Sequence, residues 1–334
     1  MWGGHYAKWA RAFRISVLFA LVISIFSTTL YSWFTPGDLE LGVTFSDRYA
    51  EELGLDWQET YLAILDDLQV KKIRLPVYWS AVEPIEGQRN FETIDWMMDE
   101  AAKHDTEVTL VIGVKVPRWP ECFAPDWVEG ASRDKQAAAV NSFIAETVTR
   151  YKNHPALLRW QIENEALFSF GICESIDPAQ LFFKVDTVRV LDPNHPIQLT
   201  ASGEQSIWLA SAIPADVLGV SVYQWAWNPV VGFLPIPVSD MVYATQKKLA
   251  NPFVDSVIVS ELQAEPWFPS YWDKSDVSKL EVYYSLFTAA DLMRHVSLAE
   301  RIGVDEAYLW GVEWWYYLKV HGDERLWNLG RSLF

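Results

Sequence analysis

Two stretches of the sequence end an apolar run with acidic residues. Trp160–Leu167 reads WQIENEAL and Val257–Trp267 reads VIVSELQAEPW, so Glu165 and Glu261 each lie at the end of an expected buried strand. Two carboxyl groups at the mouth of one site are what glycoside hydrolysis requires, because one group acts as an acid and the other as a nucleophile or base. The elements that carry the two carboxyls decide whether they can meet.

From Leu39 onward, short apolar runs alternate with longer amphipathic segments, a pattern typical of a parallel sheet with crossover helices. The expected strands are Leu39–Phe45, Ile73–Trp79, Val108–Val114, Leu158–Asn164, Ile197–Ala201, Val217–Tyr223, Val257–Glu261 and Ala307–Gly311. The expected helices are Trp57–Leu68, Ile94–His104, Lys135–Tyr151, Pro178–Leu191, Ile207–Ile213, Val238–Leu249 and Ser278–Ile302. This order predicts an α/β fold, a (β/α)8 TIM barrel over residues 35–334, with a doubly wound sheet as the alternative. We expect the Pro-rich stretch Pro229–Pro237 to form an active-site loop.

The active site of such a barrel lies at the carboxyl ends of its strands. Asn164 and Glu165 end the fourth expected strand, and Glu261 ends the seventh. This arrangement resembles the clan A glycoside hydrolases, retaining (β/α)8 barrels that include cellulases and β-galactosidases, and the resemblance covers nearly all of residues 39–334. It implies that Glu165 is the general acid/base, that Glu261 is the nucleophile and that Asn164 binds the sugar 2-hydroxyl.

The chemistry gives independent reasons for these roles. A retaining site needs one neutral carboxylic acid and one ionised carboxylate, roughly 5–5.5 Å apart. Arg74, at the inner end of the second strand, is the natural partner of Glu261, because a nearby cation favours the ionised carboxylate. Tyr223 ends the sixth strand, and we expect it either to donate a hydrogen bond to Glu261 or to pack in the barrel rim. Clan members often carry an arginine and a tyrosine in these roles.

The alternation of a strand complicates the motif. It places Glu163 and Glu165 on one face and Asn164 on the other, so a regular strand cannot direct both Asn164 and Glu165 to one sugar. Either a bulge redirects one of them or Glu163 shares the site. The motif favours Glu165 as the acid and Glu163 as a buried support. Glu265 lies beyond the seventh strand, where we expect a loop or substrate contact.

Other residues near expected strand ends are candidates for sugar binding, because aromatic faces suit the C–H faces of pyranose rings. Trp310 lies where clan A enzymes place a tryptophan beneath the sugar, with a core tryptophan as the alternative. Trp314 and Trp315 are either further platforms or rim packing. The remaining candidates around the mouth are Trp79, Trp119, Arg118, Glu121, Glu204 and Glu313.

The overall charge limits the possible partners. The formal net charge is −17, and every acidic residue follows position 35. Nucleic acid and an anionic membrane surface would repel so acidic a body, which favours a neutral carbohydrate as substrate. Neither a metal-ligand spacing nor a Gly-rich phosphate loop is present in the sequence, so we expect no cofactor and no metal. The oligomeric state is left open.

The N-terminal segment predicts an exported protein. Ile15–Phe34 is an uncharged, largely apolar run, about as long as a helix that crosses a bilayer, and three basic residues precede it, Lys8, Arg11 and Arg14. The positive-inside rule then predicts a cytoplasmic tail at residues 1–14, a transmembrane signal anchor at 15–34 and an extracytoplasmic catalytic domain. A cleaved signal peptide and a secreted enzyme are the alternative.

The chain has two cysteines, Cys122 and Cys173. Both fall in segments just after expected strands, the third and the fourth, so their loops are neighbours in a barrel. An oxidising compartment would allow a disulfide between them, and two unrelated thiols are the alternative.

The sequence therefore predicts a retaining β-glycoside hydrolase that cleaves O-glycosidic bonds of oligo- or polysaccharides by double displacement. An envelope-glycan transglycosylase would use the same residues, with an acceptor sugar in place of water. A non-catalytic carbohydrate-binding barrel is the third hypothesis. The sugar, its linkage and exo or endo cleavage are not determined, because loop variation sets specificity on one scaffold.

Overall fold

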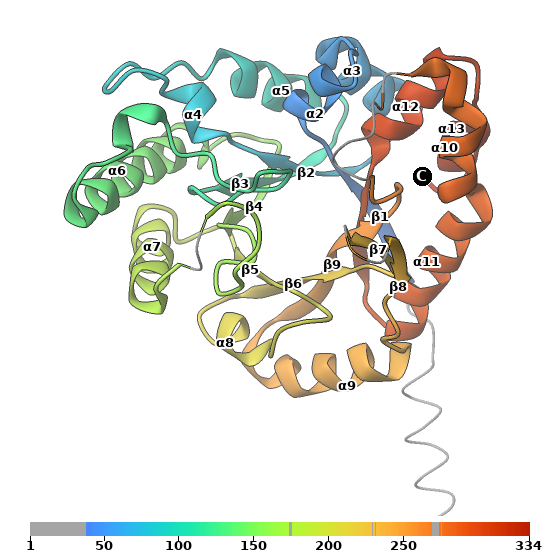
Figure 1. Ribbon diagram of the computed structural model, residues 1–334. Helices are drawn as coiled ribbons and strands as arrows, with labels where there is room; N and C mark the ends of the chain where they lie inside the picture. Colours follow the sequence, from blue (N-terminus) through green and yellow to red (C-terminus); the bar gives the residue numbers. More distant parts are fainter. Residues whose placement is uncertain (1–37, 174–175, 229, 231, 269–273, 275) are drawn as a thin grey trace, which may run out of the picture.

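The computed structural model describes residues 38–334 except 174–175, 229, 231, 269–273 and 275. Eight parallel strands close into a barrel in the order β1-β10-β9-β6-β5-β4-β3-β2. Helices surround the barrel on the outside (Figure 1). The predicted (β/α)8 TIM barrel is confirmed.

Each barrel strand corresponds to an expected one. The strands are β1 (Glu40–Thr44), β2 (Lys72–Pro76), β3 (Glu107–Ile112), β4 (Leu157–Ile162), β5 (Ile197–Ala201), β6 (Val217–Val222), β9 (Ser256–Gln263) and β10 (Glu306–Trp310). Two ends differ in a way that affects the site. β2 stops at Pro76, before Trp79, and β9 continues past Glu261 to Gln263.

The helices include several short ones that the sequence pattern did not predict. The helices are α2 (Asp47–Glu52), α3 (Trp57–Asp66), α4 (Trp79–Val82), α5 (Glu92–Lys103), α6 (Arg133–Tyr151), α7 (Pro178–Leu191), α8 (Leu209–Ala212), α9 (Asp240–Ala250), α10 (Leu280–Leu286), α11 (Ala289–Ile302), α12 (Val312–Val320) and α13 (Arg325–Gly330). α7 has the predicted bounds, because Asp177 caps it by accepting hydrogen bonds from the N–H groups of Ala179 and Gln180. α2, α4, α12 and α13 are too short to give a clear helical period.

The expectation of one long helix over Ser278–Ile302 is wrong. α10 ends before Phe287, whose backbone is extended at φ −151°, and α11 starts after Thr288. The Thr288 hydroxyl accepts from the Asp291 N–H, while the Asp291 carboxylate accepts from the Thr288 N–H, which is a capping box. The cap satisfies backbone groups at the start of α11 and so stabilises a new helix at this point.

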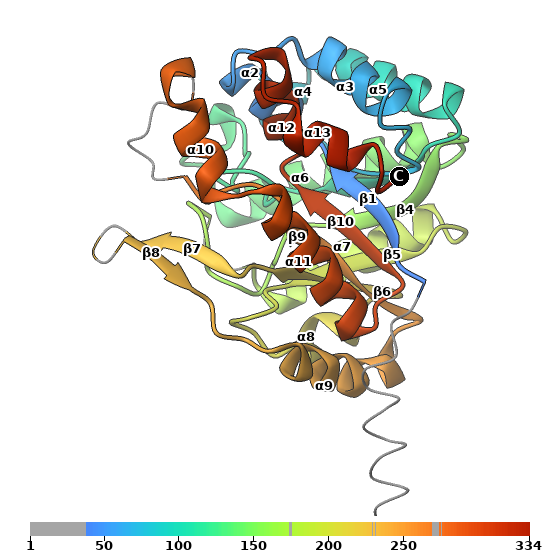
Figure 2. The ribbon, with the colours of Figure 1, turned by 90° about the vertical axis from the view of Figure 1, so that its right-hand side faces the viewer.

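A β-hairpin follows β6 where the sequence predicted a Pro-rich loop. Its antiparallel strands are β7 (Trp225–Asn228) and β8 (Gly232–Pro235), and Trp227 pairs with Phe233. Figure 2 shows the hairpin projecting from the barrel on the side toward which β1 and β10 point. The segment therefore lies at the carboxyl end of the barrel, as expected, although it is a hairpin.

The barrel interior is polar, whereas the space between strands and helices is apolar. Along β4, Trp160 faces outward, since its Nε1 donates to Asp192 at the end of α7, 2.8 Å away. Arg159 faces the barrel axis, where it pairs with Glu306 of β10. Lys72 of β2 donates to the same carboxylate at 2.8 Å. Inward positions thus carry charges that need partners from other strands.

The predicted cytoplasmic tail and signal anchor, residues 1–34, lie outside the described residues. In the part of the chain that the structure describes, no helix is both long enough and apolar enough to cross a bilayer.

The capping box of α11 gives a stability test. We expect Thr288→Ala to lower the free energy of unfolding by about 1 kcal/mol, because the hydrogen bond to the Asp291 N–H is lost. Urea denaturation measures the change. Ser239→Ala is the matched control, because Ser239 holds the N-cap position of α9 without a side-chain capping bond. Equal effects of the two substitutions would contradict the expectation.

Candidate active site

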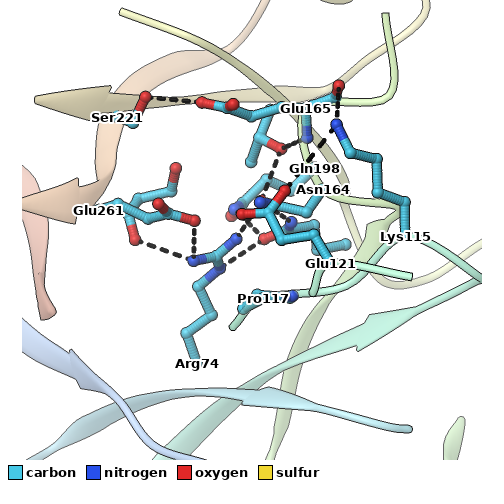
Figure 3. Close-up of polar contacts among 12 residues, drawn as sticks. Arg74, Lys115, Pro117, Glu121, Asn164, Glu165, Gln198, Ser221 and Glu261 are labelled. Carbon is cyan, nitrogen blue, oxygen red and sulfur yellow. Dashed lines mark hydrogen bonds and ion pairs between the residues drawn. The ribbon is translucent and has the colours of Figure 1, made fainter. Parts of the chain in front are cut away.

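Glu261, the predicted nucleophile, lies at a bulge in β9. The register between β6 and β9 shifts just before this residue, and bulges redirect side chains at strand ends. The side chain is buried, and Arg74 Nη1 donates to its Oε1 at 2.9 Å (Figure 3). Tyr223 Oη donates to its Oε2 at 3.0 Å. One cation and one neutral hydroxyl therefore stabilise the ionised carboxylate.

Arg74 connects this carboxylate to the fourth strand. It is fully buried in the middle of β2, and its Nε donates to Gln161 Oε1 at 2.7 Å. Its Nη2 donates to Asn164 Oδ1 at 2.6 Å (Figure 3). Because the guanidinium is planar and always charged, it holds Glu261 and Asn164 in a fixed relation. Asn164 Nδ2 is buried without a hydrogen-bond partner, so this donor is available to a ligand.

The backbone after β4 resolves the problem of alternation. β4 ends at Ile162, and both Glu163 and Glu165 have positive φ, at 58° and 41°. These two residues lie in the left-handed region, a backbone conformation that is uncommon for residues other than glycine. They therefore break the alternation of the strand. Asn164 and Glu165 therefore reach the same cluster of side chains (Figure 3).

Glu163 is turned away from the mouth and is fully buried. It accepts hydrogen bonds from the backbone N–H groups of Val114 at 2.9 Å and Lys115 at 2.6 Å, and it pairs with Lys184 of α7. Gly113 allows this approach, since a Cβ at that position would lie 2.3 Å from the Glu163 carboxyl carbon. Glu163 thus ties β4 to the loop after β3 and does not share the site.

Glu165 occupies a different electrostatic environment from Glu261. Ser221 Oγ of β6 donates to its Oε1 at 2.6 Å, and the Glu165 N–H donates to Thr200 Oγ1 of β5 at 2.7 Å. Burial, followed by the negative charge of Glu261, raises the pKa of Glu165 to about 7. At neutral pH a large share of this carboxyl is therefore protonated and able to give up a proton.

Arg118, on the loop after β3, organises a second group of predicted site residues. Its guanidinium carbon lies 3.9 Å from the ring centroid of Tyr49 and 4.2 Å from that of Trp310. It also forms ion pairs with Glu265 at 2.5 Å and Glu313 at 2.7 Å. Trp310 ends β10 as expected, but Arg118 covers one of its faces, so a sugar can stack only on the other.

Glu313 is not available to a substrate, in contrast to the prediction. It is fully buried in α12, where its Oε1 accepts from the Ser46 N–H at 2.7 Å and its Oε2 from Arg118. Burial raises the pKa of Glu313 to about 7. The sequence could not distinguish this buried partner of Arg118 from an exposed acid at the mouth.

Trp79 is also not a sugar contact. Because β2 ends before it, Trp79 lies in α4 with 1% of its surface exposed, and its Nε1 donates to Glu83 at 2.8 Å. Its ring stacks on Phe143 of α6, with the centroids 5.6 Å apart. Trp314 and Trp315 are likewise fully buried, which is the packing alternative that the sequence left open.

Glu204 supports the site from the loop after β5. Its Oε1 accepts from the Tyr223 N–H at 2.6 Å and from Tyr243 Oη of α9 at 2.9 Å. Burial raises the pKa of Glu204 to about 7. The contact fixes the backbone of Tyr223 and hence the hydroxyl that reaches Glu261.

A row of aromatic rings crosses the mouth of the barrel. Trp119, after β3, is 66% exposed and lies 6.3 Å from Phe170, after β4. Phe170 lies 6.1 Å from Trp267, after β9, which lies 5.4 Å from Tyr223. Since β5 and β6 separate β4 from β9 in the barrel, the row joins opposite sides of the mouth. Trp119 is its outer member.

A disulfide holds two of these loops together. Cys122 and Cys173 are bonded, with their Cα atoms 5.1 Å apart, and they join the loops after β3 and β4. Between the same loops, the Ile172 N–H donates to Pro120 O at 3.0 Å. The loop that carries Arg118 and Trp119 is thus fixed to the loop that follows Glu165.

Sequence reasoning missed the residues that contact Glu165 and Glu163. Thr200 and Ser221 are hydroxyl residues in otherwise largely apolar strands, a signal that was present in the sequence. Lys184 and Lys115 gave no comparable signal. Lys115 Nζ donates to the backbone oxygens of Glu165 at 3.1 Å and Phe168 at 2.7 Å, a contact that depends on how the loops fold.

The hydrogen bond from Ser221 gives a test of the acidity of Glu165. This bond lowers the pKa of Glu165 against the larger effects of burial and Glu261, so Ser221→Ala should raise that pKa above its wild-type value of about 7. Carbon NMR of glutamate-labelled protein measures it, with Glu165→Gln assigning the resonance. Ser285→Ala, an exposed serine on α10, should leave it unchanged. An equal or lower pKa in Ser221→Ala would contradict the assignment.

The disulfide gives a second test. The bridge closes a loop with a sequence separation of 51, for which chain entropy predicts a stabilisation of about 4 kcal/mol. We expect Cys122→Ser/Cys173→Ser to lower the unfolding free energy by about 2–4 kcal/mol in urea denaturation. Mass spectrometry of the oxidised wild type should find neither thiol free. Two free thiols together with unchanged stability after reduction would contradict the bridge.

Comparisons with known proteins find partial matches in sequence. A family model described as beta-galactosidase, for glycoside hydrolase family 42, matches residues 55–183. The beta-galactosidase BgaA of Clostridium cellulovorans is 25% identical over 189 residues, which is 50% of this chain and 28% of the relative. The beta-galactosidase Pbg of Clostridium perfringens is 32% identical over 108 residues, 26% of this chain and 15% of the relative. The matches thus span less than a third of these relatives' length.

Solved structures share the fold at low sequence identity. An exo-β-1,4-mannosidase from Opitutaceae bacterium strain TAV5 has a TM-score of 0.56 at 16% identity, covering 81% of this chain and 51% of that protein. The GH5_18 protein of Bifidobacterium longum has a TM-score of 0.59 at 12% identity, covering 82% and 70%. These likenesses establish the barrel alone. The chain is therefore similar over residues 55–183 to the beta-galactosidase family model, and it shares its barrel fold with solved glycoside hydrolases.

Proposed function

We propose that this protein is a retaining β-glycoside hydrolase in which Glu261 is the nucleophile and Glu165 the general acid/base. One observation carries the proposal: the two carboxyls have different hydrogen-bond and charge partners. Arg74 forms an ion pair with Glu261, whereas Glu165 accepts from the neutral Ser221 and its pKa is raised to about 7. Double displacement needs such a pair, one ionised and one protonated.

In the proposed first step, the Glu261 carboxylate attacks the anomeric carbon while the bond to the leaving oxygen breaks. Glu165 gives its proton to that oxygen and becomes ionised. In the second step Glu165 takes a proton from water, the water oxygen bonds to the anomeric carbon, and Glu261 leaves as a carboxylate. Arg74 and Tyr223 bond to Glu261 in the free enzyme, so they stabilise the carboxylate before attack and after release.

Two further groups support the binding of a sugar at this point. The Asn164 amide has its oxygen bonded to Arg74 and its buried Nδ2 free of protein partners, so it suits the 2-hydroxyl of the sugar under attack. Trp310, at the end of β10, is 8% exposed and keeps one face free of Arg118. We assign to it the apolar face of the same ring.

The relatives found by sequence suggest which substrate to test first. Three of them are named beta-galactosidases, and the matching family model carries the same description. We therefore propose β-galactosides as the first substrates to test, followed by other neutral β-glycosides, with oligo- or polysaccharides as the natural targets. Analysis of products in the presence of acceptor sugars separates hydrolysis from transglycosylation.

We also propose that the catalytic domain is extracytoplasmic and anchored through residues 15–34. The disulfide between Cys122 and Cys173 supports an oxidising compartment. The chain enters β1 at Glu40, at the end of the barrel opposite the carboxyl ends of the strands. An anchor just before β1 would direct the mouth away from the bilayer. Proteolysis of intact cells tests this location, since an outward domain is cleaved and a cytoplasmic one is protected.

The nucleophile assignment gives the decisive test. Glu261→Ala should lower kcat/KM on an aryl β-galactoside by about 10⁴-fold or more, and azide should restore turnover by entering the space of the lost carboxylate. Glu107→Ala is the matched control, because Glu107 is an exposed glutamate at the start of β3, at the other end of the barrel. Full activity of Glu261→Ala on a glycoside that the wild type cleaves would refute the mechanism. Binding without any cleavage by the wild type would favour the non-catalytic barrel.

A further inference from the structure

Glu121 is a third carboxyl at the mouth of the barrel, and the proposed mechanism does not use it. The residue is 6% exposed, and its buried Oε2 has no hydrogen-bond partner. Lys115 has its Nζ 3.9 Å from that oxygen, which is close enough for an ion pair and too far for a hydrogen bond. A buried polar atom without a partner has lost its hydrogen bonds to water and gained none in return, so it destabilises the fold unless a ligand bonds to it. An oxygen without a hydrogen bond, beside a candidate active site, is therefore suited to accept one from a ligand.

The loop that carries Glu121 is held firmly in place. Glu121 has a positive φ of 56°, and its N–H donates to Arg118 O at 2.8 Å. The next residue, Cys122, is bonded to Cys173. On the facing loop, a Cβ at Gly171 would lie 2.4 Å from Pro120 O and 2.9 Å from the Glu121 Cβ. Close packing and a covalent bond thus maintain a strained backbone that directs the side chain.

The charges around Glu121 come from both proposed catalytic carboxyls. Burial raises the pKa of Glu121 well above its ordinary value, and the negative charges of Glu261 and Glu165 raise it further, against Lys115 and Arg74. Figure 3 shows the Glu121 carboxyl among these side chains. A neutral carboxylic acid has both an O–H donor and an acceptor oxygen. Such a group can bond to sugar hydroxyls without adding a charge beside the nucleophile.

We propose that Glu121 binds a hydroxyl of the sugar that occupies the cleavage site and thereby determines which neutral glycon is accepted. The inference rests on the proposed glycoside hydrolase function. A sugar hydroxyl both donates and accepts hydrogen bonds, so it can bond to the Oε2 of Glu121. Epimeric sugars place this hydroxyl on opposite faces of the ring, so the bond can form with only one epimer. A uronic acid in the same place would bring a negative charge toward the proposed nucleophile, Glu261. The site therefore favours neutral sugars.

A coupling experiment tests the role of Glu121. Aryl β-glycosides that lack one hydroxyl at a time are compared on the wild type, Glu121→Ala and Glu121→Gln. We expect one particular deoxygenation to cost the wild type about 10- to 100-fold in kcat/KM, and Glu121→Ala to cost a similar factor on the full substrate. The two losses should not add, because both remove the same hydrogen bond. Glu121→Gln keeps a donor and an acceptor and should retain most activity.

Glu129→Gln is the matched control, because Glu129 is an exposed glutamate of the same loop; it should leave kcat/KM unchanged for every substrate. Equal losses of Glu121→Ala on all deoxy substrates would overturn the inference and leave Glu121 a structural residue of the loop. Calorimetric titration with the same glycosides gives a second readout that needs no turnover. If the wild type binds but does not cleave, the proposed function fails, while coupling in Kd still tests Glu121. If it neither binds nor cleaves any of them, both proposals are overturned.

Discussion

The candidate site depends on the buried guanidinium of Arg74. A fixed positive charge inside the barrel is tolerable only when it is paired and hydrogen-bonded, and it meets this requirement through Glu261, Asn164 and Gln161. These partners lie on β9, after β4 and in β4, so one side chain of β2 links both sides of the mouth. Because the guanidinium does not lose its proton, Arg74 remains a cation throughout the ordinary pH range.

The carboxyl groups at and near the mouth of the barrel differ in their cationic partners. Glu261 pairs with Arg74, Glu163 with Lys184, and Glu265 and Glu313 share Arg118. Glu165 instead accepts from a serine, and burial raises its pKa to about 7.

The cations therefore distinguish acids of the same residue type. A neutral partner at Glu165 and a cation at Glu261 make acid chemistry at the first carboxyl compatible with nucleophilic attack by the second. Glu121 resembles Glu165, since Lys115 is too distant to donate a hydrogen bond to it and burial raises its pKa well above the ordinary value.

The loops contribute as much as the strands to this arrangement. The loop after β3 carries Arg118, Trp119 and Glu121, and the disulfide fixes it to the loop after β4. Aromatic contacts continue from Trp119 across the mouth to Tyr223. The residues that surround a substrate are thus positioned by contacts between loops distant in sequence.

Local pattern was sufficient for the barrel. The eight strands and several helices follow from runs of apolar residues and from caps such as Asp177, because hydrophobic periodicity and capping act over a few residues. The same reasoning failed at Thr288, where a capping box interrupts an apolar period, and at Trp79, where the strand ends early. Each failure comes from an element boundary, which one or two local contacts decide.

The sequence by itself determined the fold class, the strands that position Asn164, Glu165 and Glu261, and the expectation that Arg74 faces them. Only the tertiary structure decided how Asn164 and Glu165 share one site, since the positive φ values of Glu163 and Glu165 break the alternation that the strand pattern imposes. It also decided that Glu313 is bound by Arg118 and that the Oε2 of Glu121 has no hydrogen-bond partner near the proposed catalytic carboxyls. The physical reason is that burial and pairing depend on groups far apart in the chain, which local periodicity does not encode.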